Sequence, residues 1–200
     1  MELLGYYESP FVRRVAVTLQ LYGMAFTHRP LATGPDAAAI RAKNPLGRIP
    51  ALLLDDGEVL LDSVFIVDWL DEQAGEQALV PRAGPERRRV LRLVALAQGA
   101  TEKYVAAYYE RHKRPDTHVW PPWLERLEGQ VFSALSALEG MVVGPWLLGE
   151  RLTHADVAVA CGILAMRADM PHLAPAGRFS RLDALVRAAE EMAAFVATRP

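Results

Sequence analysis

The spacing of apolar residues changes once along this chain of 200 residues. Up to about residue 75, short apolar runs alternate with segments that carry the 3.6-residue repeat of an amphipathic helix. Beyond about residue 85, only the helical repeat remains. The length allows one or two packed domains, because a domain commonly holds about 100–150 residues. The pattern therefore predicts an α/β unit followed by an all-helical unit.

The first part of the chain predicts a βαβ segment. Leu3 to Tyr7 form an apolar and aromatic run typical of a strand, and a helical repeat follows from Val12 to Leu19. Residues 26–31 are expected to form a second strand, before a short helix that begins at Asp36. This order predicts a right-handed parallel crossover.

A ββα segment is predicted next. The apolar residues 51–54 and 58–61 flank Asp55-Asp56-Gly57, and an Asp-Gly step favours a hairpin turn. A helix is expected from about Asp62 to Ala74. The two segments together predict a small mixed sheet covered by helices.

Glycines and prolines without periodicity mark a linker after this unit. The helices expected beyond it run from about Glu86 to Arg111, through residues 124–138, and over Thr153 to Met170 and Arg181 to Ala197. We therefore divide the chain into an α/β domain at 1–75, a linker at 76–85 and a helical domain at 86–200.

Composition and charge exclude several classes. The single cysteine, Cys161, excludes an intramolecular disulfide and fits a reducing compartment. Residues 1–80 hold six Lys and Arg against eleven Asp and Glu, and no concentrated basic face is indicated for nucleic acid. The densest apolar stretch, Val157 to Met166, is about half of what a bilayer requires, and we expect no secretory signal. We expect a cytoplasmic protein with no membrane or nucleic-acid partner and no metal.

Ser9-Pro10 lies where the first strand gives way to the first helix. A serine N-cap followed by proline at the first helical position explains both residues, with a contribution of about 1 kcal/mol. A second interpretation is that the hydroxyl, at the positive end of the helix dipole, donates a hydrogen bond to a bound thiolate. The sequence alone leaves both interpretations open.

Two further segments combine structural and binding signals. Pro50 at the start of a strand is ordinary punctuation if trans, whereas a cis Ile49-Pro50 bond would leave the Ile49 backbone free to pair with an extended peptide. Asp62-Ser63 suits a helix cap, and the same groups are able to hold a ligand's ammonium and carboxylate.

Taken in order, Ser9 to Arg14, Asn44 to Leu52 and Leu61 to Ser63 resemble the glutathione-binding half of soluble glutathione transferases. Leu147 to Asp156 resembles the start of a buried helix in the second domain of that family, with Thr153 and Asp156 as a capping box. The resemblance covers nearly the whole chain. It implies a thioredoxin-like α/β domain followed by an all-α domain, with glutathione as co-substrate.

The resemblance also implies roles for individual residues. Ser9 would contact the glutathione sulfur, Ile49 would pair through its backbone with the cysteinyl unit, and Pro50 would be cis. Asp62 and Ser63 would hold the γ-glutamyl end. The full set of glutathione-binding residues that we expect is Phe11, Arg48, Ile49, Pro50, Asp62 and Ser63.

Tyrosines near Ser9 offer an alternative, because some classes of the family use a tyrosine hydroxyl for the thiol. Tyr6 and Tyr7 would point to opposite faces of a strand, so only one of them is expected to face the sulfur. We prefer Ser9 for this role. Disulfide exchange is disfavoured, since relatives that perform it carry cysteine at this position and serine forms no mixed disulfide.

The second-substrate pocket is expected to use Tyr7, Tyr104, Tyr108 and His112, the last three of which share one helix face. Ordinary core packing explains that stripe equally well. Family members usually form homodimers, and Arg87-Arg88-Arg89 would face the acidic residues Asp68, Asp71 and Glu72 if charge contributes. The alternative is that both charged helix faces lie in solvent and contribute little to a dimer.

We expect a glutathione S-transferase that conjugates the glutathione thiolate to a small hydrophobic electrophile, with a role in detoxification. The alternative is a non-catalytic binding or regulatory protein that uses the same fold, because a fold does not determine a function.

Overall fold

The computed structural model describes residues 1–200 and divides into two compact units. Unit 1 comprises Met1–Leu79 together with Glu190–Pro200, and unit 2 comprises Val80–Ala189. The division after Leu79 lies inside the segment expected to be a linker. The last eleven residues pack with unit 1, whereas the sequence division assigned all of 86–200 to the helical domain.

Unit 1 contains a mixed four-stranded sheet of order β2-β1-β3-β4. The strands are β1 (Glu2–Leu4), β2 (Thr27–Arg29), β3 (Ala51–Leu53) and β4 (Val59–Leu61). β1 and β2 are parallel, with Leu3 opposite His28, and the other pairs are antiparallel. The predicted crossover and hairpin are both present, and Gly57 adopts φ 93° in the hairpin turn.

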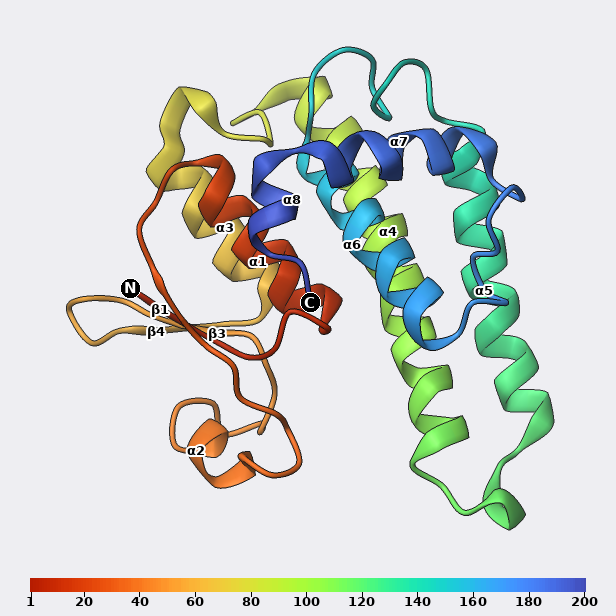
Figure 1. The fold of residues 1–200 in the computed structure, drawn as a ribbon. Coiled ribbons are helices and arrows are strands. Elements are labelled where there is room, and N and C mark those ends of the chain that lie inside the picture. Colours follow the sequence, from red (N-terminus) through yellow and green to blue (C-terminus); the bar gives the residue numbers. More distant parts are fainter. The chain divides into compact units, whose positions relative to one another are not determined.

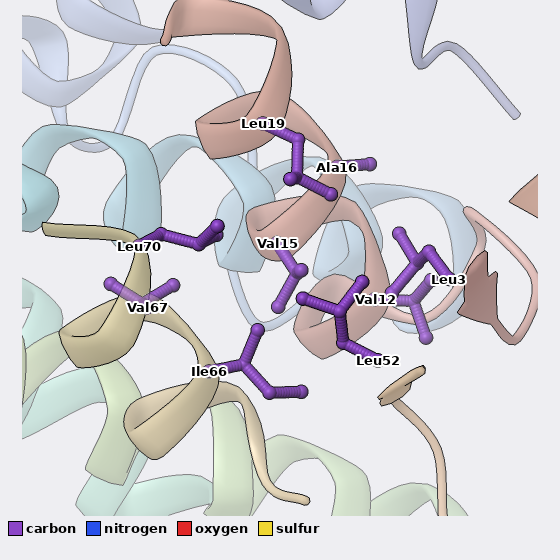
Figure 2. Close-up of a cluster of buried hydrophobic side chains, with 9 residues drawn as sticks. All are labelled: Leu3, Val12, Val15, Ala16, Leu19, Leu52, Ile66, Val67 and Leu70. Carbon is purple, nitrogen blue, oxygen red and sulfur yellow. The ribbon is translucent and has the colours of Figure 1, made fainter. Parts of the chain in front are cut away.

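The helices of unit 1 are α1 (Pro10–Leu21), α2 (Ala37–Arg41), α3 (Ser63–Ala74) and α8 (Ala193–Ala197), with a 3₁₀ turn, η1, at Gly75–Gln77. α1 and α3 pack together on one side of the strands, and α2 lies on the other side (Figure 1). Figure 2 shows the cluster that joins α1, α3 and the sheet. It consists of Leu3, Val12, Val15, Ala16, Leu19, Leu52, Ile66, Val67 and Leu70.

The first strand is shorter than expected. β1 ends at Leu4, and Gly5 turns the chain with φ 122°. Tyr6 and Tyr7 therefore lie in the turn before α1, and the prediction that they alternate along a strand is wrong.

Unit 2 consists of helices. They are α4 (Gly84–His112), α5 (Pro121–Glu139), α6 (His154–Asp169) and α7 (Ser180–Glu191), with a 3₁₀ turn, η2, at Asp116–His118. α4 packs along both α5 and α6. The predicted capping box begins α6, where the Asp156 carboxylate accepts from the backbone N–H of Thr153 at 2.8 Å. Asp156 also accepts from the Leu147 N–H at 2.7 Å, so it holds the preceding loop to the helix.

The helix expected over Arg181 to Ala197 is two helices. Met192 has extended backbone angles, φ −72° and ψ 137°, and separates α7 from α8. α8 packs against α1, and its Phe195 is fully buried in that contact. None of the helices combines the length and the apolar character that a membrane span requires.

Candidate functional site

Ser9 is the N-cap of α1. Its backbone is extended, with φ −70° and ψ 118°, and Pro10 follows as the first helical residue. The Val12 N–H donates to Ser9 Oγ at 3.4 Å. Because the oxygen accepts this bond, the hydroxyl hydrogen is still available to an anion at the helix terminus. Capping and thiolate binding are therefore compatible in this geometry, and no acidic side chain occupies the first turn of α1.

The loop before β3 is organised by Asn44, which is buried. Its side-chain amide donates to the Arg48 carbonyl at 2.8 Å, and its side-chain oxygen accepts from the Leu46 N–H at 3.0 Å. The Ile49-Pro50 peptide bond that follows is cis, as the family resemblance implies. Pro50 is buried and Ile49 is half-buried, while Arg48 is exposed.

Asp62 and Ser63 begin α3. Asp62 Oδ1 accepts from the Val64 N–H at 2.9 Å, which makes Asp62 the N-cap. Asp62 is the only non-glycine residue with positive φ, at 69°. Such a conformation costs on the order of 1–3 kcal/mol and occurs most often at functional sites. The Asp62 side chain is exposed, and Ser63 is buried beside it.

Contacts through α1 bring the three segments together. Arg14 Nη1 donates to Ser63 Oγ at 3.4 Å, so the first helix reaches the start of α3. At the other segment, a Cβ on Gly5 would lie 2.6 Å from Val12 Cγ2 and 2.9 Å from Ile49 Cβ. Gly5 is thus wedged between the first turn of α1 and the residue before Pro50. Only glycine fits this close approach at positive φ.

Comparison with known proteins places this arrangement in a family. The chain matches the model of the glutathione S-transferase N-terminal domain over residues 3–78 and that of the C-terminal domain over residues 121–188. It is 31% identical over 183 residues to the GST-like protein YibF of Escherichia coli, with 86% of this chain and 90% of that protein covered. The chain belongs to the glutathione S-transferase family. The family predicted from the sequence motifs is therefore confirmed, and so is the prediction that the chain belongs to a family of enzymes.

Two further relatives are similar to this transferase family member along most of its length. A maleylacetoacetate isomerase of Pseudomonas aeruginosa is 30% identical over 165 residues, which cover 78% of this chain and 77% of that protein. A solved structure of a glutathione transferase family member from Pseudomonas fluorescens Pf-5, with bound glutathione, superposes with a TM-score of 0.90 and 34% identity. That match covers 100% of this chain and 98% of the other. The thioredoxin-like unit followed by a helical unit is therefore confirmed.

The two tyrosines near Ser9 differ in environment. Tyr6 is exposed. The Tyr7 ring stacks on the His28 ring with 3.8 Å between centroids and 5° between planes. Burial raises the pKa of the Tyr7 hydroxyl above its ordinary value of 10.0, which makes it a weaker proton donor to an anion.

The residues expected to line a second-substrate pocket do not share one environment. Tyr104 is 2% exposed and its hydroxyl donates to Asp169, so it is part of the core of unit 2. Tyr108 and His112 are in ring contact, with 4.6 Å between centroids, and His112 is exposed. Tyr7 belongs to unit 1, where Phe11 is half-buried on α1.

An open groove in unit 2 does not include any of these aromatic residues. It has a volume of about 640 Å³ and is lined by Leu96, Arg126, Gly129, Gln130, Ser133 and Ala134. No group of three or more His, Cys, Asp or Glu side chains is arranged to hold a metal ion.

Sequence reasoning missed Asn44 and Arg14 as residues that organise the site. The sequence Asn44-Pro45-Leu46-Gly47 is typical of a turn that an asparagine side chain stabilises. The role of Asn44 could therefore have been predicted from the sequence. Arg14 carried no such signal. Its burial is visible only once α1 is seen to pack within unit 1.

Proposed function

We propose that this protein is a glutathione S-transferase in which Ser9 stabilises the glutathione thiolate for attack on a small hydrophobic electrophile. The observation that carries the proposal is the Ser9 hydroxyl at the N-terminus of α1, which has no acidic residue in its first turn. The similarity of the whole chain to the glutathione-bound relative from Pseudomonas fluorescens supports glutathione as the thiol.

One hydroxyl at a helix terminus is able to supply the free energy that lowers the pKa of the glutathione thiol. A thiol of pKa about 8.5 is mostly protonated at neutral pH, and lowering that pKa by about two units requires roughly 2.7 kcal/mol. A hydrogen bond to a charged group contributes about 1.5–3 kcal/mol and the helix terminus about 0.3–1 kcal/mol more. Ser9 and the α1 dipole together are sufficient.

The other two segments would hold the peptide. The backbone of Ile49, beside cis Pro50, would pair with the cysteinyl unit. The γ-glutamyl carboxylate would bind at the α3 N-terminus near Ser63, and its ammonium would face the Asp62 carboxylate. Phe11 and Arg48 complete the proposed binding residues.

Substitutions at Ser9 separate the chemical role from the cap. Ser9→Ala removes both the donor and the cap, and we expect at least about a tenfold loss in kcat/KM if the donor contributes 1.4 kcal/mol or more. Ser9→Asp keeps a strong N-cap but places an acceptor-only anion beside the sulfur. We expect near-normal stability and almost no conjugation for this variant. Normal conjugation by Ser9→Asp would remove Ser9 from the mechanism.

Glutathione-dependent isomerisation is a second candidate. It is favoured by the similarity to the maleylacetoacetate isomerase of Pseudomonas aeruginosa. A thiolate that adds to a conjugated double bond and is expelled after bond rotation is regenerated, whereas conjugation consumes one glutathione per product. Measuring free thiol during turnover distinguishes the two. A protein that binds glutathione and turns over no electrophile would instead be the non-catalytic alternative.

A homodimer is part of the proposal, and fewer acidic side chains are exposed for a charge contribution than the sequence suggested. Asp71 is not a surface charge, because the residue is 7% exposed and its carboxylate accepts from the Tyr22 hydroxyl and the Leu79 N–H. Asp68 and Glu72 are exposed on α3, and Arg88 and Arg89 are exposed on α4. Reversal of both arginines should weaken self-association in sedimentation measurements at low salt.

A further inference from the structure

The turn that carries Ser9 contacts the side chain of His28, a residue that the proposed mechanism does not use. This turn runs from Gly5, at the end of β1, to Ser9, at the start of α1. His28 lies on β2, beside Leu3 in the parallel register. Two of the contacts that hold the turn come from the His28 side chain.

The first contact is a hydrogen bond. His28 Nε2 lies 2.7 Å from the Gly5 carbonyl oxygen. A carbonyl oxygen only accepts, so Nε2 carries the hydrogen. The Gly5 N–H donates to the Arg29 carbonyl at 3.0 Å, so both polar groups of the Gly5 backbone are bound to consecutive residues of β2.

The second contact is the parallel stack of Tyr7 on His28, with ring centroids 3.8 Å apart. Parallel rings at this distance restrict Tyr7, which is two residues before Ser9. The Ser9 N–H then donates to the Tyr6 carbonyl at 3.2 Å and closes the turn. His28 therefore contacts the turn at Gly5 and at Tyr7, and Ser9 is its last residue.

Gly5 extends this support to the second segment of the site. A Cβ added at Gly5 would clash with Val12 and Ile49. The Val12 N–H is in turn bound to Ser9 Oγ. A shift of Gly5 by a fraction of an ångström would therefore move the α1 terminus and Ile49 relative to each other. The distance between a donor and an anion decides how much the anion is stabilised.

We propose that His28 is a positioning residue of the thiolate site, which sets the place of the Ser9 hydroxyl through the Gly5 carbonyl and the Tyr7 ring. The inference rests on the proposed function of Ser9.

Two substitutions test the two contacts. His28→Phe keeps a flat ring for Tyr7 and removes the donor to Gly5. His28→Gln keeps an N–H donor and removes the ring. His172→Phe is the matched control, because His172 is exposed in unit 2 and pairs with Glu128.

The decisive readout is the pKa of the bound glutathione thiol, followed by its ultraviolet thiolate absorbance. We expect His28→Phe to raise this pKa by about half a unit or more, and to lower kcat at neutral pH by about threefold or more. The rate should return to the wild-type plateau at alkaline pH, where the thiol ionises without help. The glutathione Kd from calorimetry should change by less than about threefold, because Asp62 and Ser63 are unchanged.

The outcomes separate the inference from the function on which it rests. A wild-type protein that binds no glutathione, or that leaves the bound thiol pKa unshifted, overturns the proposed function and the inference together. A lowered thiol pKa in the wild type that persists in both His28 variants overturns the inference alone. If His28→Phe does not fold, the bound-thiol pKa of His28→Ala, which lacks both the donor and the ring, decides, and an unchanged value overturns the inference.

Discussion

Arg13 donates a hydrogen bond from Nη2 to the backbone carbonyl of Phe195, 182 residues further along the chain, at 3.3 Å. The guanidinium carbon also lies 5.6 Å from the centroid of the Phe195 ring. Both residues are buried. Unit 1 is thus completed by the C-terminal segment, and α1, which carries Ser9 at its start, is covered by α8.

Removal of the Phe195 ring should destabilise unit 1. Phe195→Ala leaves a cavity against α1 and removes the cation–π partner of Arg13, so we expect a loss of about 3–5 kcal/mol in the free energy of unfolding. Val196→Ala is the control, because Val196 is 50% exposed on the same helix and should cost less than about 1 kcal/mol. Urea unfolding measures both, and equal losses would contradict the packing of α8 on α1.

The charge of Asp62 is separable from its cap. Asp62→Asn should retain the hydrogen bond from the Val64 N–H and tolerate φ 69°, because asparagine accepts through its side-chain oxygen and adopts positive φ more readily than most residues. We expect unchanged stability and a glutathione Kd raised by about three- to tenfold.

The matched variant is Asp56→Asn, which makes the same charge change in the exposed hairpin turn. It should leave the glutathione Kd unchanged in calorimetry. A similar rise in both variants would mean that only the net charge of unit 1 matters.

Two glycines in helices should respond to alanine in opposite directions. Gly129 in α5 has open space around its Cβ position, so Gly129→Ala should stabilise by about 0.5–1 kcal/mol. A Cβ at Gly162 in α6 would lie 2.5 Å from Thr101 Oγ1, and Thr101 is buried and bonded to the Ala97 carbonyl. Gly162→Ala should therefore destabilise by about 1–3 kcal/mol.

The clash at Gly162 has a direct check in thermal or urea unfolding. In a Thr101→Ala background the obstructing oxygen is absent, and Gly162→Ala should lose most of its cost. An undiminished cost in that background would mean that another contact between α4 and α6 limits their approach.

Tyr104 should make stability depend on alkaline pH. Burial, followed by the hydrogen bond to Asp169, raises the pKa of Tyr104 above its ordinary value of 10.0. A raised pKa in the fold means that the contribution is complete below about pH 10 and is lost as pH rises towards the folded value. At about pH 8 the wild type should exceed Tyr104→Phe by about 1–2 kcal/mol in unfolding free energy.

The difference should shrink in unfolding measurements at about pH 11, because only the unfolded wild type ionises there. Tyr109→Phe is the control, since Tyr109 lies on the same helix and is 47% exposed. A difference that stays constant or grows with pH would contradict the raised pKa.

Local features of the fold were predictable because each depends on residues a few positions apart. Ser9 and Pro10 begin α1, Gly57 turns the hairpin, and Thr153 with Asp156 caps α6, all as expected. A cap or a turn is decided by one side chain and the backbone next to it. The change in apolar spacing near residue 80 likewise marked the division between the two units.

Contacts between distant residues were not predictable from the single sequence. Three hydrogen bonds join residues separated by 23, 49 and 182 positions, namely His28 with Gly5, Arg14 with Ser63 and Arg13 with Phe195. Nothing in the local pattern marks such partners, because burial and packing select them after the elements have formed. The break at Met192 has the same cause, since the helical repeat continues past it.

The sequence by itself determined most of the strands and helices and where α1 and α6 begin, because these follow from local backbone preferences and apolar periodicity. Only the tertiary structure decided that Arg14 of α1 reaches Ser63, that Tyr7 stacks on His28, and that the C-terminus completes unit 1. Those relationships depend on the three-dimensional packing of side chains, and one-dimensional spacing does not specify it.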